Sequence, residues 1–277
     1  MQPLDVTRGD GPLVLGVPHS GTYIPEDIRE RLNSLGQKRA DTDWHVDRLY
    51  SDLLPGATMV RANFHRYVID ANRDPEGVSL YPGQNTTTLC PTTDFDGKPI
   101  YHEGQEPNAG EIESRRLAWH APYHAALRAE LERVRAKHGV AILYDCHSIR
   151  SVVPFLFEGT LPDFNTGTNN GVTCAPEFET AVSDRTRNAD GYSAVLNGRF
   201  KGGWTTRHYG RPSEGFHAIQ MELAQKTHLA TEDLPFDYDE DKARRLRTHL
   251  KDILAALEAI APVLADQNSK IEGAHHE

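Results

Sequence analysis

The segment GVAILYDCHSIR, residues 139–150, is the clearest guide to the fold. Its apolar run Val140–Tyr144 ends abruptly in an acid, a thiol and an imidazole. A short apolar run bounded by polar residues is typical of a buried strand in an α/β sheet. Because side chains alternate along a strand, Asp145 and His147 share one face, whereas Cys146 packs on the other face as a small hydrophobe.

The segment LVLGVPHSG, residues 13–21, repeats this arrangement and leads to His19. In open α/β sheets a ligand binds beyond the carboxyl ends of the strands, so His19 and His147 can point into one crevice. A single histidine at a strand end is most simply a surface residue or a hydrogen-bonded one. Two in the same context favour a metal site, although their spacing matches no local metal motif such as HExxH.

Other short apolar runs alternate with helical patterns, which indicates an α/β sheet covered by helices. We expect strands at Leu13–Val17, Thr58–Ala62, Tyr67–Asp70, Val140–Asp145, Val152–Phe157, Ala194–Asn197 and Ala218–Leu223. We expect helices at Pro25–Leu35, Val46–Leu54, Glu111–His138, Pro176–Arg187 and Asp239–Leu264, the third of them kinked or broken by Pro122.

No shift in composition marks a linker, so we predict one catalytic domain over residues 1–277, with a tail at 268–277. Two connections, 71–110 and 158–175, are long for a compact domain and are rich in glycine and polar residues. Long loops of this kind are usually functional or disordered. Each follows a strand that carries polar candidate residues, so we expect both to wall the active site.

The amino-acid composition limits the classes of protein to which the chain can belong. Of the 277 residues, 38% are hydrophobic and 25% are charged, as in ordinary globular proteins. No apolar run approaches the ~20 residues of a membrane span, and the N-terminus lacks the features of a signal peptide, so we expect a cytoplasmic protein. The three cysteines form no CxxC pair, which argues against a disulfide framework and a zinc–thiolate site.

The net charge limits the kinds of molecule that the protein is expected to bind. A net charge of −10 argues against nucleic acid and anionic membranes. A small anionic substrate would also be repelled unless arginines are placed locally to bind it. The oligomeric state is left open by the sequence.

The segment ADTDWHVDRLY, residues 40–50, supplies three carboxylates, Asp41, Asp43 and Asp47. They can serve as an acidic helix N-terminus, with Asp41 or Asp43 as the cap. Alternatively, one of them adds an oxygen ligand to the two histidines. Two histidines and a carboxylate with an open position form a standard catalytic zinc site.

Two further segments carry arginines. In FHRYVIDANRDP, residues 64–75, Arg73 can bind a carboxylate through its planar guanidinium, although an Asp70–Arg73 ion pair is a simpler role. The segment GRFKGGWTTRHYGRP, residues 198–212, has the composition of a flexible basic loop that can close over an anion.

The segment GFHAIQMELAQ, residues 215–225, has a strand pattern with one carboxylate, Glu222. A charged residue inside a buried strand is costly unless it is paired or used. Glu222 is therefore either a paired structural residue or a general base beside a metal-bound water.

Taken together, these segments resemble the N-formylglutamate amidohydrolase family over residues 12–230. The resemblance rests on VPHSGTYIP, DTDWHVDRLY, RYVIDANRDP, SLYPGQ, LYDCHSIRS, LNGRFKGG, TRHYGRP and QMELAQ. The family is related in fold to zinc carboxypeptidases and aspartoacylase. The resemblance thus implies a three-layer α/β/α fold with a mixed central sheet, like that of the zinc exopeptidases and other phosphorylase/hydrolase-like proteins.

The resemblance also implies roles for individual residues. His19 and His147 correspond to metal ligands, and Asn72 and Arg73 to the pair that holds a substrate carboxylate. Glu222 corresponds to the catalytic glutamate. The carboxypeptidases and aspartoacylase take another ligand from His-x-x-Glu, but Ser20, Gly21 and Thr22 follow His19 here, so that ligand must come from elsewhere.

Asp43 is the first choice for that ligand, with Asp47 second and Asp41 third. Asp145 can orient the ring of His147 or be a ligand itself. The site is expected to hold one Zn²⁺ per chain, or another divalent metal.

The function implied is zinc-dependent hydrolysis of N-formyl-L-glutamate to L-glutamate and formate, the last step of one histidine-degradation route. Arg73 would bind one substrate carboxylate and Arg207 the other. The alternatives are a zinc amidohydrolase or carboxypeptidase-like enzyme for another N-acyl amino acid, and a non-catalytic dicarboxylate-binding protein. A serine hydrolase is disfavoured because neither Ser20 nor Ser148 lies in a GxSxG motif.

Overall fold

The computed structural model describes residues 1–79 and 83–274, with side chains up to residue 266. Residues 80–82, within the SLYPGQ motif, and 275–277, within the expected tail, lie outside the described residues. The centre of the fold is a seven-stranded sheet in the order β1-β3-β2-β4-β7-β5-β6. Its strands are β1 (Leu4–Thr7), β2 (Leu13–Val17), β3 (Thr58–Ala62), β4 (Ala141–Ile149), β5 (Phe164–Gly167), β6 (Ala194–Leu196) and β7 (Phe216–Ala224).

The sheet is mixed, as expected. β2 runs parallel to both β3 and β4, and β4 runs parallel to β7. β1 is antiparallel to β3 at one edge, and β5 is antiparallel to β7 near the other. The carboxyl ends of β2, β4 and β7 therefore meet at one edge of the sheet, where polar side chains can converge.

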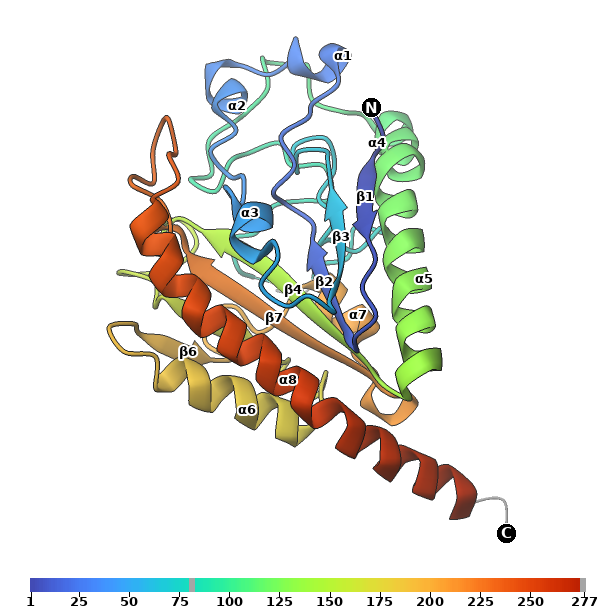
Figure 1. The fold of residues 1–277 in the computed structure, drawn as a ribbon. Coiled ribbons are helices and arrows are strands. Elements are labelled where there is room, and N and C mark those ends of the chain that lie inside the picture. Colours follow the sequence, from blue (N-terminus) through green and yellow to red (C-terminus); the bar gives the residue numbers. More distant parts are fainter. Residues whose placement is uncertain (80–82, 275–277) are drawn as a thin grey trace.

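Helices cover both faces of this sheet (Figure 1). The helices are α1 (Glu26–Arg29), α2 (Ser34–Lys38), α3 (Val46–Tyr50), α4 (Ala109–Arg115), α5 (Ala121–His138), α6 (Pro176–Arg187), α7 (Trp204–Tyr209) and α8 (Glu240–Ala274), with a π-helical turn at Arg116–His120 and short 3₁₀ turns at Pro212–Glu214 and Gln225–Thr227. α3, α6 and α8 pack on one face and α5 on the other. The predicted α/β/α fold with a mixed sheet is confirmed.

The two cores follow the alternation of β4. Ile142, Tyr144 and Cys146 belong to the core under α3, α6 and α8. Ala141 and Leu143 belong to the core under α5. All nine residues of β4 are buried, so Asp145 and His147 are carried into the protein on the face opposite to Cys146, as the sequence predicts.

Several strand predictions are confirmed and others are wrong. β2 and β3 have the predicted bounds, and β4, β6 and β7 lie where strands were expected. Residues 67–70 and 152–157 instead form turns and irregular segments. Pro154 cannot donate to a ladder, which disfavours a strand at 152–157. The sequence analysis missed β1, a short exposed edge strand, and β5, whose sequence FNTG is largely polar.

The helices also differ in detail. The single helix expected at 25–35 is two short helices, because the Asn33 side chain accepts hydrogen bonds from Leu35 and Gly36 and starts a new helix there. A π-helical turn precedes Pro122, so the long helix is interrupted rather than ended. α8 runs past the expected end at Leu264 to Ala274 and takes up most of the expected tail. Figure 1 shows its last turns projecting beyond the sheet.

The two long connections behave differently. The 71–110 connection contributes Asn85, Thr86 and Thr87 to the pocket that also contains His19 and His147, as expected of an active-site wall. The 158–175 region contains β5 and contributes no described residue to that pocket, so the expectation for it is wrong. Among the described residues, no helix is long and apolar enough to cross a membrane.

Candidate metal centre and active site

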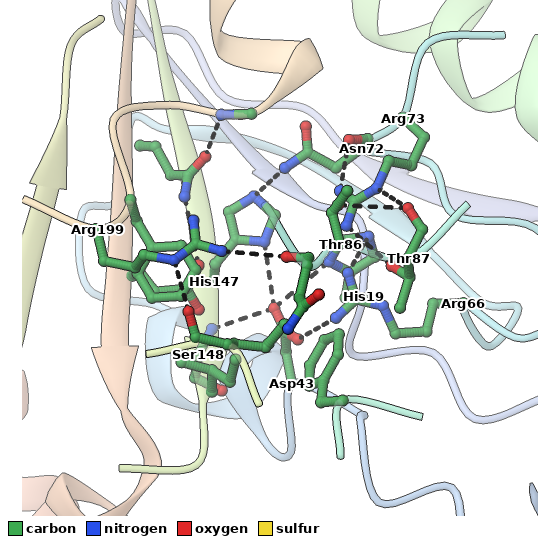
Figure 2. A pocket seen from close by; sticks show the side chains of 18 residues that line it. His19, Asp43, Arg66, Asn72, Arg73, Thr86, Thr87, His147, Ser148 and Arg199 are labelled. Atoms are coloured by element: carbon green, nitrogen blue, oxygen red, sulfur yellow. Dashed lines mark hydrogen bonds and ion pairs between the residues drawn. The ribbon is translucent and has the colours of Figure 1, made fainter. Parts of the chain in front are cut away.

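The pocket lies at the carboxyl ends of β2, β4 and β7 (Figure 2). A concave site with a few convergent polar groups is typical of a small-molecule binding site. Its polar lining includes His19, Asp43, Arg66, Asn72, Arg73, His147, Arg199 and Glu222. Residues from segments far apart in the sequence therefore meet here.

Three of these residues form a compact group that could hold a metal ion. One ligand atom each from His19, Asp43 and His147 lies within 4.8 Å of the others. Asp43 Oδ2 is 3.2 Å from His147 Nδ1 and 3.7 Å from His19 Nδ1. His19 directly follows β2, His147 lies near the end of β4, and Asp43 precedes α3, its main-chain N–H donating to the carbonyl of His19.

A buried carboxylate lies next to Nε2 of each imidazole. His19 Nε2 is 2.7 Å from Asp70 Oδ1, and His147 Nε2 is 3.1 Å from Asp145 Oδ1. The His19–Asp70 contact is a hydrogen bond, whereas His147 Nε2 meets Asp145 as an ion pair and is 3.3 Å from the Asn72 side-chain amide. A ring held by a carboxylate at one nitrogen presents its other nitrogen as a ligand, which is the usual environment of metal-binding histidines. Both rings thus direct Nδ1 toward Asp43.

The group fits a divalent metal. His19 Nδ1 and Asp43 Oδ1 are buried and make no hydrogen bond. Buried polar atoms normally have partners, so these two are explained if they bind an ion. Two imidazoles and one carboxylate are donors that zinc prefers in catalytic sites.

The electrostatics hold these carboxylates ionised. Burial alone would raise the pKa of Asp43, but its contacts with His147 and His19 and the nearby charge of Arg66 hold that pKa below its usual value. Burial likewise opposes ionisation of Asp70, but the charge of Arg66, whose Nη2 is 2.9 Å from Asp70 Oδ2, holds its pKa well below the usual range. The anionic group therefore suits a cation.

The alternative ligands do not join this group. Asp47 Oδ2 is 2.6 Å from Arg61 Nη1, and Asp47 lines a different surface pocket, because α3 turns its side chain away from His147. Asp41 Oδ2 accepts hydrogen bonds from the Tyr67 hydroxyl and the Phe95 main-chain N–H. Asp145 takes the place expected for a residue that orients His147, and its Oδ2 accepts a hydrogen bond from Thr206.

Glu222 lies directly opposite His147 in the parallel pairing of β4 and β7. Glu222 lines the pocket, and the residue as a whole is 7% exposed. Gln220, two residues earlier on the same face, donates to Glu222 Oε2 at 3.3 Å. Burial raises the pKa of Glu222 to about 8, with Asp43 adding to the effect and His147 and Arg66 opposing it. A carboxyl group of this kind can exchange a proton near neutral pH.

The expected substrate-binding pair also reaches the pocket. Arg73 donates to the Thr87 carbonyl and hydroxyl at 3.0 and 2.9 Å. Asn72 Oδ1 accepts a hydrogen bond from the Thr205 main-chain N–H. Gly203 allows this close approach, since a Cβ there would collide with the Asn72 amide. Asn72 is thereby held between β4 and α7.

Arg207 is placed differently from expectation. The segment expected to be a flexible loop contains α7, and Arg207 Nε donates to the Gly202 carbonyl at 2.9 Å. Arg207 is not among the described residues that line the pocket, whereas Arg199, eight residues earlier, is. The cation from this segment that faces the pocket is therefore Arg199.

Sequence reasoning missed the roles of three other residues. Asp70 and Arg66 contact His19 across about fifty residues of sequence, so these contacts could not be inferred from spacing. Gln220 shares the pocket face of β7 with Glu222, so the alternation of the strand could have identified it.

Comparisons with known proteins agree with the sequence resemblance. The family model for N-formylglutamate amidohydrolase matches residues 11–229. N-formylglutamate deformylase of Pseudomonas putida is 46% identical over 259 residues, covering 92% of this chain and 95% of that protein. The enzyme of the same name from Pseudomonas aeruginosa is 45% identical over 257 residues, with the same coverage.

A solved structure extends this likeness to the fold. N-formylglutamate amidohydrolase from Ralstonia eutropha JMP134 matches with a TM-score of 0.76 at 27% identity, covering 92% of this chain and 97% of that one. Sequence and architecture agree over nearly the whole length. The chain belongs to the N-formylglutamate amidohydrolase family.

Proposed function

We propose that this protein hydrolyses N-formyl-L-glutamate to L-glutamate and formate, using a zinc ion bound by His19, Asp43 and His147. The main support is the convergence of these three buried side chains in one pocket. Curated relatives at 45–46% identity over 92% of the chain are N-formylglutamate deformylases. A role in histidine degradation, and a single catalytic domain over residues 1–277, belong to the same proposal.

Residues next to the three ligands hold them in the orientation that metal binding needs. A bound zinc ion would supply a Lewis acid for the formyl carbonyl and make a water molecule acidic enough to attack it. Asp70 and Asp145 fix the ring orientations of His19 and His147 and increase the basicity of their Nδ1 atoms. Preformed geometry of this kind lowers the cost of organising the reacting groups.

Glu222 is the proposed proton carrier. Its carboxylate accepts the proton of the attacking water and returns it to the departing amine nitrogen. The pKa of about 8 is set mainly by burial, and a cation at the neighbouring ligands would lower it toward neutrality. Gln220 holds the carboxyl group on the pocket side of β7.

Two arginines are assigned to the substrate, one for binding and one for stabilising charge during the reaction. Arg73 binds a substrate carboxylate beside Asn72, because its guanidinium is fixed at the pocket wall by Thr87. Arg66 Nη1 is 3.6 Å from Asp43 Oδ1 and lines the pocket, so its charge is available to stabilise negative charge on the formyl oxygen.

The test is deformylation of N-formyl-L-glutamate by purified protein before chelation, after chelation and after zinc is restored. We expect activity that disappears with the chelator and returns with zinc. Glu222→Gln should keep the bound metal and lose about 100-fold or more in kcat, the usual contribution of a general base. Full activity after complete metal removal, or in Glu222→Gln, would contradict the proposal.

A further inference from the structure

We propose that Arg199 binds the side-chain carboxylate of the substrate and so determines the preference for an acidic N-acyl amino acid. This inference rests on the proposed function and deepens it, since it names the residue that distinguishes glutamate from a neutral amino acid.

The first argument is position. Arg73 and Arg199 both line the pocket that contains His19, Asp43 and His147. Figure 2 shows the two guanidinium groups on opposite sides of that pocket. Arg73 follows β3 in the chain, and Arg199 lies between β6 and α7. A dicarboxylate with its scissile amide at the metal ligands can therefore meet a cation at each end.

The second argument is orientation. Arg199 Nε donates to the Leu156 carbonyl at 2.9 Å and Nη2 donates to the Asn85 carbonyl at 3.3 Å. Asn85 is itself fixed, since its side-chain amide donates to the Phe155 carbonyl at 2.8 Å. These two carbonyl acceptors orient the guanidinium group at the pocket wall. An oriented guanidinium group is well suited to bind a carboxylate.

The third argument is the contrast with neighbouring arginines. Arg207, in α7, donates from Nε to the Gly202 carbonyl and is not a described lining residue. Among the arginines of segment 198–212, Arg199 is the one that the structure brings to the pocket.

A structural role is the competing explanation, because Arg199 also joins Leu156 to Asn85. The two roles make different predictions for a neutral substrate. Loss of a structural contact would slow every substrate alike, whereas loss of a carboxylate contact would slow only the substrate that carries the charge.

The experiment compares kcat/KM for N-formyl-L-glutamate and for N-formyl-L-glutamine, which has nearly the same shape without the charge. The zinc-loaded parent, Arg199→Gln, Arg199→Lys, Arg207→Gln and Arg211→Gln are measured together. Arg211 is a matched surface control, paired with Glu214 at 2.8 Å. Melting temperatures report whether each variant is folded.

We expect the parent to prefer the acidic substrate by on the order of 100-fold, as for a charge pair shielded from water. In Arg199→Gln this ratio should collapse to within a few-fold, with activity on the glutamine substrate retained. Arg199→Lys should keep part of the preference, and Arg211→Gln should keep all of it. An equal loss on both substrates in Arg199→Gln, or a ratio that collapses only in Arg207→Gln, would overturn the proposal.

A binding measurement separates this inference from the proposed function. Calorimetric titration of L-glutamate and L-glutamine into the same proteins requires no turnover. If the parent hydrolyses neither formyl substrate, the proposed function fails, and the titrations still decide the role of Arg199. Unchanged discrimination between the two amino acids in Arg199→Gln would contradict that role.

Discussion

At the scale of single residues, each of the two candidate metal-binding histidines has a buried carboxylate beside it. His19 and His147 each have one nitrogen directed at Asp43 and the other at a buried aspartate. Because Asp70 and Asp145 are fully buried, their negative charges act on the imidazoles with little screening by water. This arrangement increases the affinity of the ligand atoms for a cation.

The variant Asp145→Asn tests whether a buried aspartate strengthens metal binding by the adjacent His147. Asn has the same shape but lacks the negative charge, so we expect zinc affinity to fall by about 10- to 100-fold. Competition with a chromogenic chelator measures the affinity. Asp47→Asn is the matched control, since Asp47 pairs with Arg61 on another surface. Equal affinities in Asp145→Asn and the parent would show that Asp145 does not support His147.

The positions of candidate residues were predictable where polar chemistry and strand periodicity coincide. His147 and Glu222 were recognisable because an apolar strand pattern surrounds each of them. The role of Asp70 was not recognisable, since its approach to His19 depends on the tertiary fold. Composition alone could not reveal α7, so it could not show that Arg199 lines the pocket whereas Arg207 does not.

At the scale of elements, the parallel pairing of β4 and β7 organises the site. The register places His147 directly across from Glu222 and Asp145 across from Gln220. Buried strands of this kind read as continuous apolar runs, which explains why they were predictable. Residues 67–70 are equally apolar but lie in a turn packed against the α5 side of the core, so hydrophobicity alone misidentified them.

The π-helical turn Arg116–His120 and α5 support the proposed substrate-binding segment, residues 71–73, from behind. His120 Nε2 is 3.1 Å from the Arg73 carbonyl, and His124 Nε2 is 2.7 Å from the Ala71 carbonyl. Burial lowers the pKa of both histidines, most strongly that of His124. A neutral imidazole that donates from Nε2 satisfies each carbonyl. The two histidines thereby hold the main chain on either side of Asn72.

Removing this support should weaken substrate binding more than chemistry. For His124→Phe we expect KM for N-formyl-L-glutamate to rise by about 3- to 10-fold, the equivalent of one hydrogen bond, with a smaller change in kcat. His124→Gln keeps a donor and should recover most of the affinity. Steady-state kinetics of both variants and of His249→Phe, a control on α8, measure the effect. A fall in kcat with KM unchanged would contradict this positioning role.

At the scale of the whole molecule, the sheet lies between two helical layers, and the buried polar groups of the candidate site lie at the carboxyl ends of its strands. The α/β class was predictable because strands alternate with helices in the sequence pattern, whereas the mixed sheet was implied by the family resemblance. The edge strand β1 and the internal strand β5 were not predictable, since both are short and have little apolar pattern. The single catalytic domain over residues 1–277 stays a prediction.

Burial of histidines also makes the fold sensitive to acid. Burial lowers the pKa of His217 from 6.5 to about 4, with Glu177 acting in the opposite direction. Its Nδ1 accepts a hydrogen bond from the Ala175 main-chain N–H at the start of α6. Between these pKa values the unfolded chain binds a proton that the folded chain does not. This contribution to stability is therefore full above pH 6.5 and is lost as the pH falls toward 4.

His217→Asn tests the sign of this effect, because Asn can keep the acceptor but does not titrate. Between pH 7 and pH 5, the free energy of unfolding should fall by about 2 kcal/mol less in the variant than in the parent. Urea unfolding at both pH values measures the difference. If the parent and the variant lose the same stability, the histidine does not contribute to acid sensitivity.

The central claim is that His19, Asp43 and His147 together bind the catalytic metal. The most direct measurement is the zinc content per chain of the parent and of Asp43→Ala after equal exposure to zinc, with the deformylation rate of the same samples. We predict one zinc ion and full activity in the parent, and the loss of both in a folded Asp43→Ala protein. Zinc and activity that both persist without Asp43 would contradict the account.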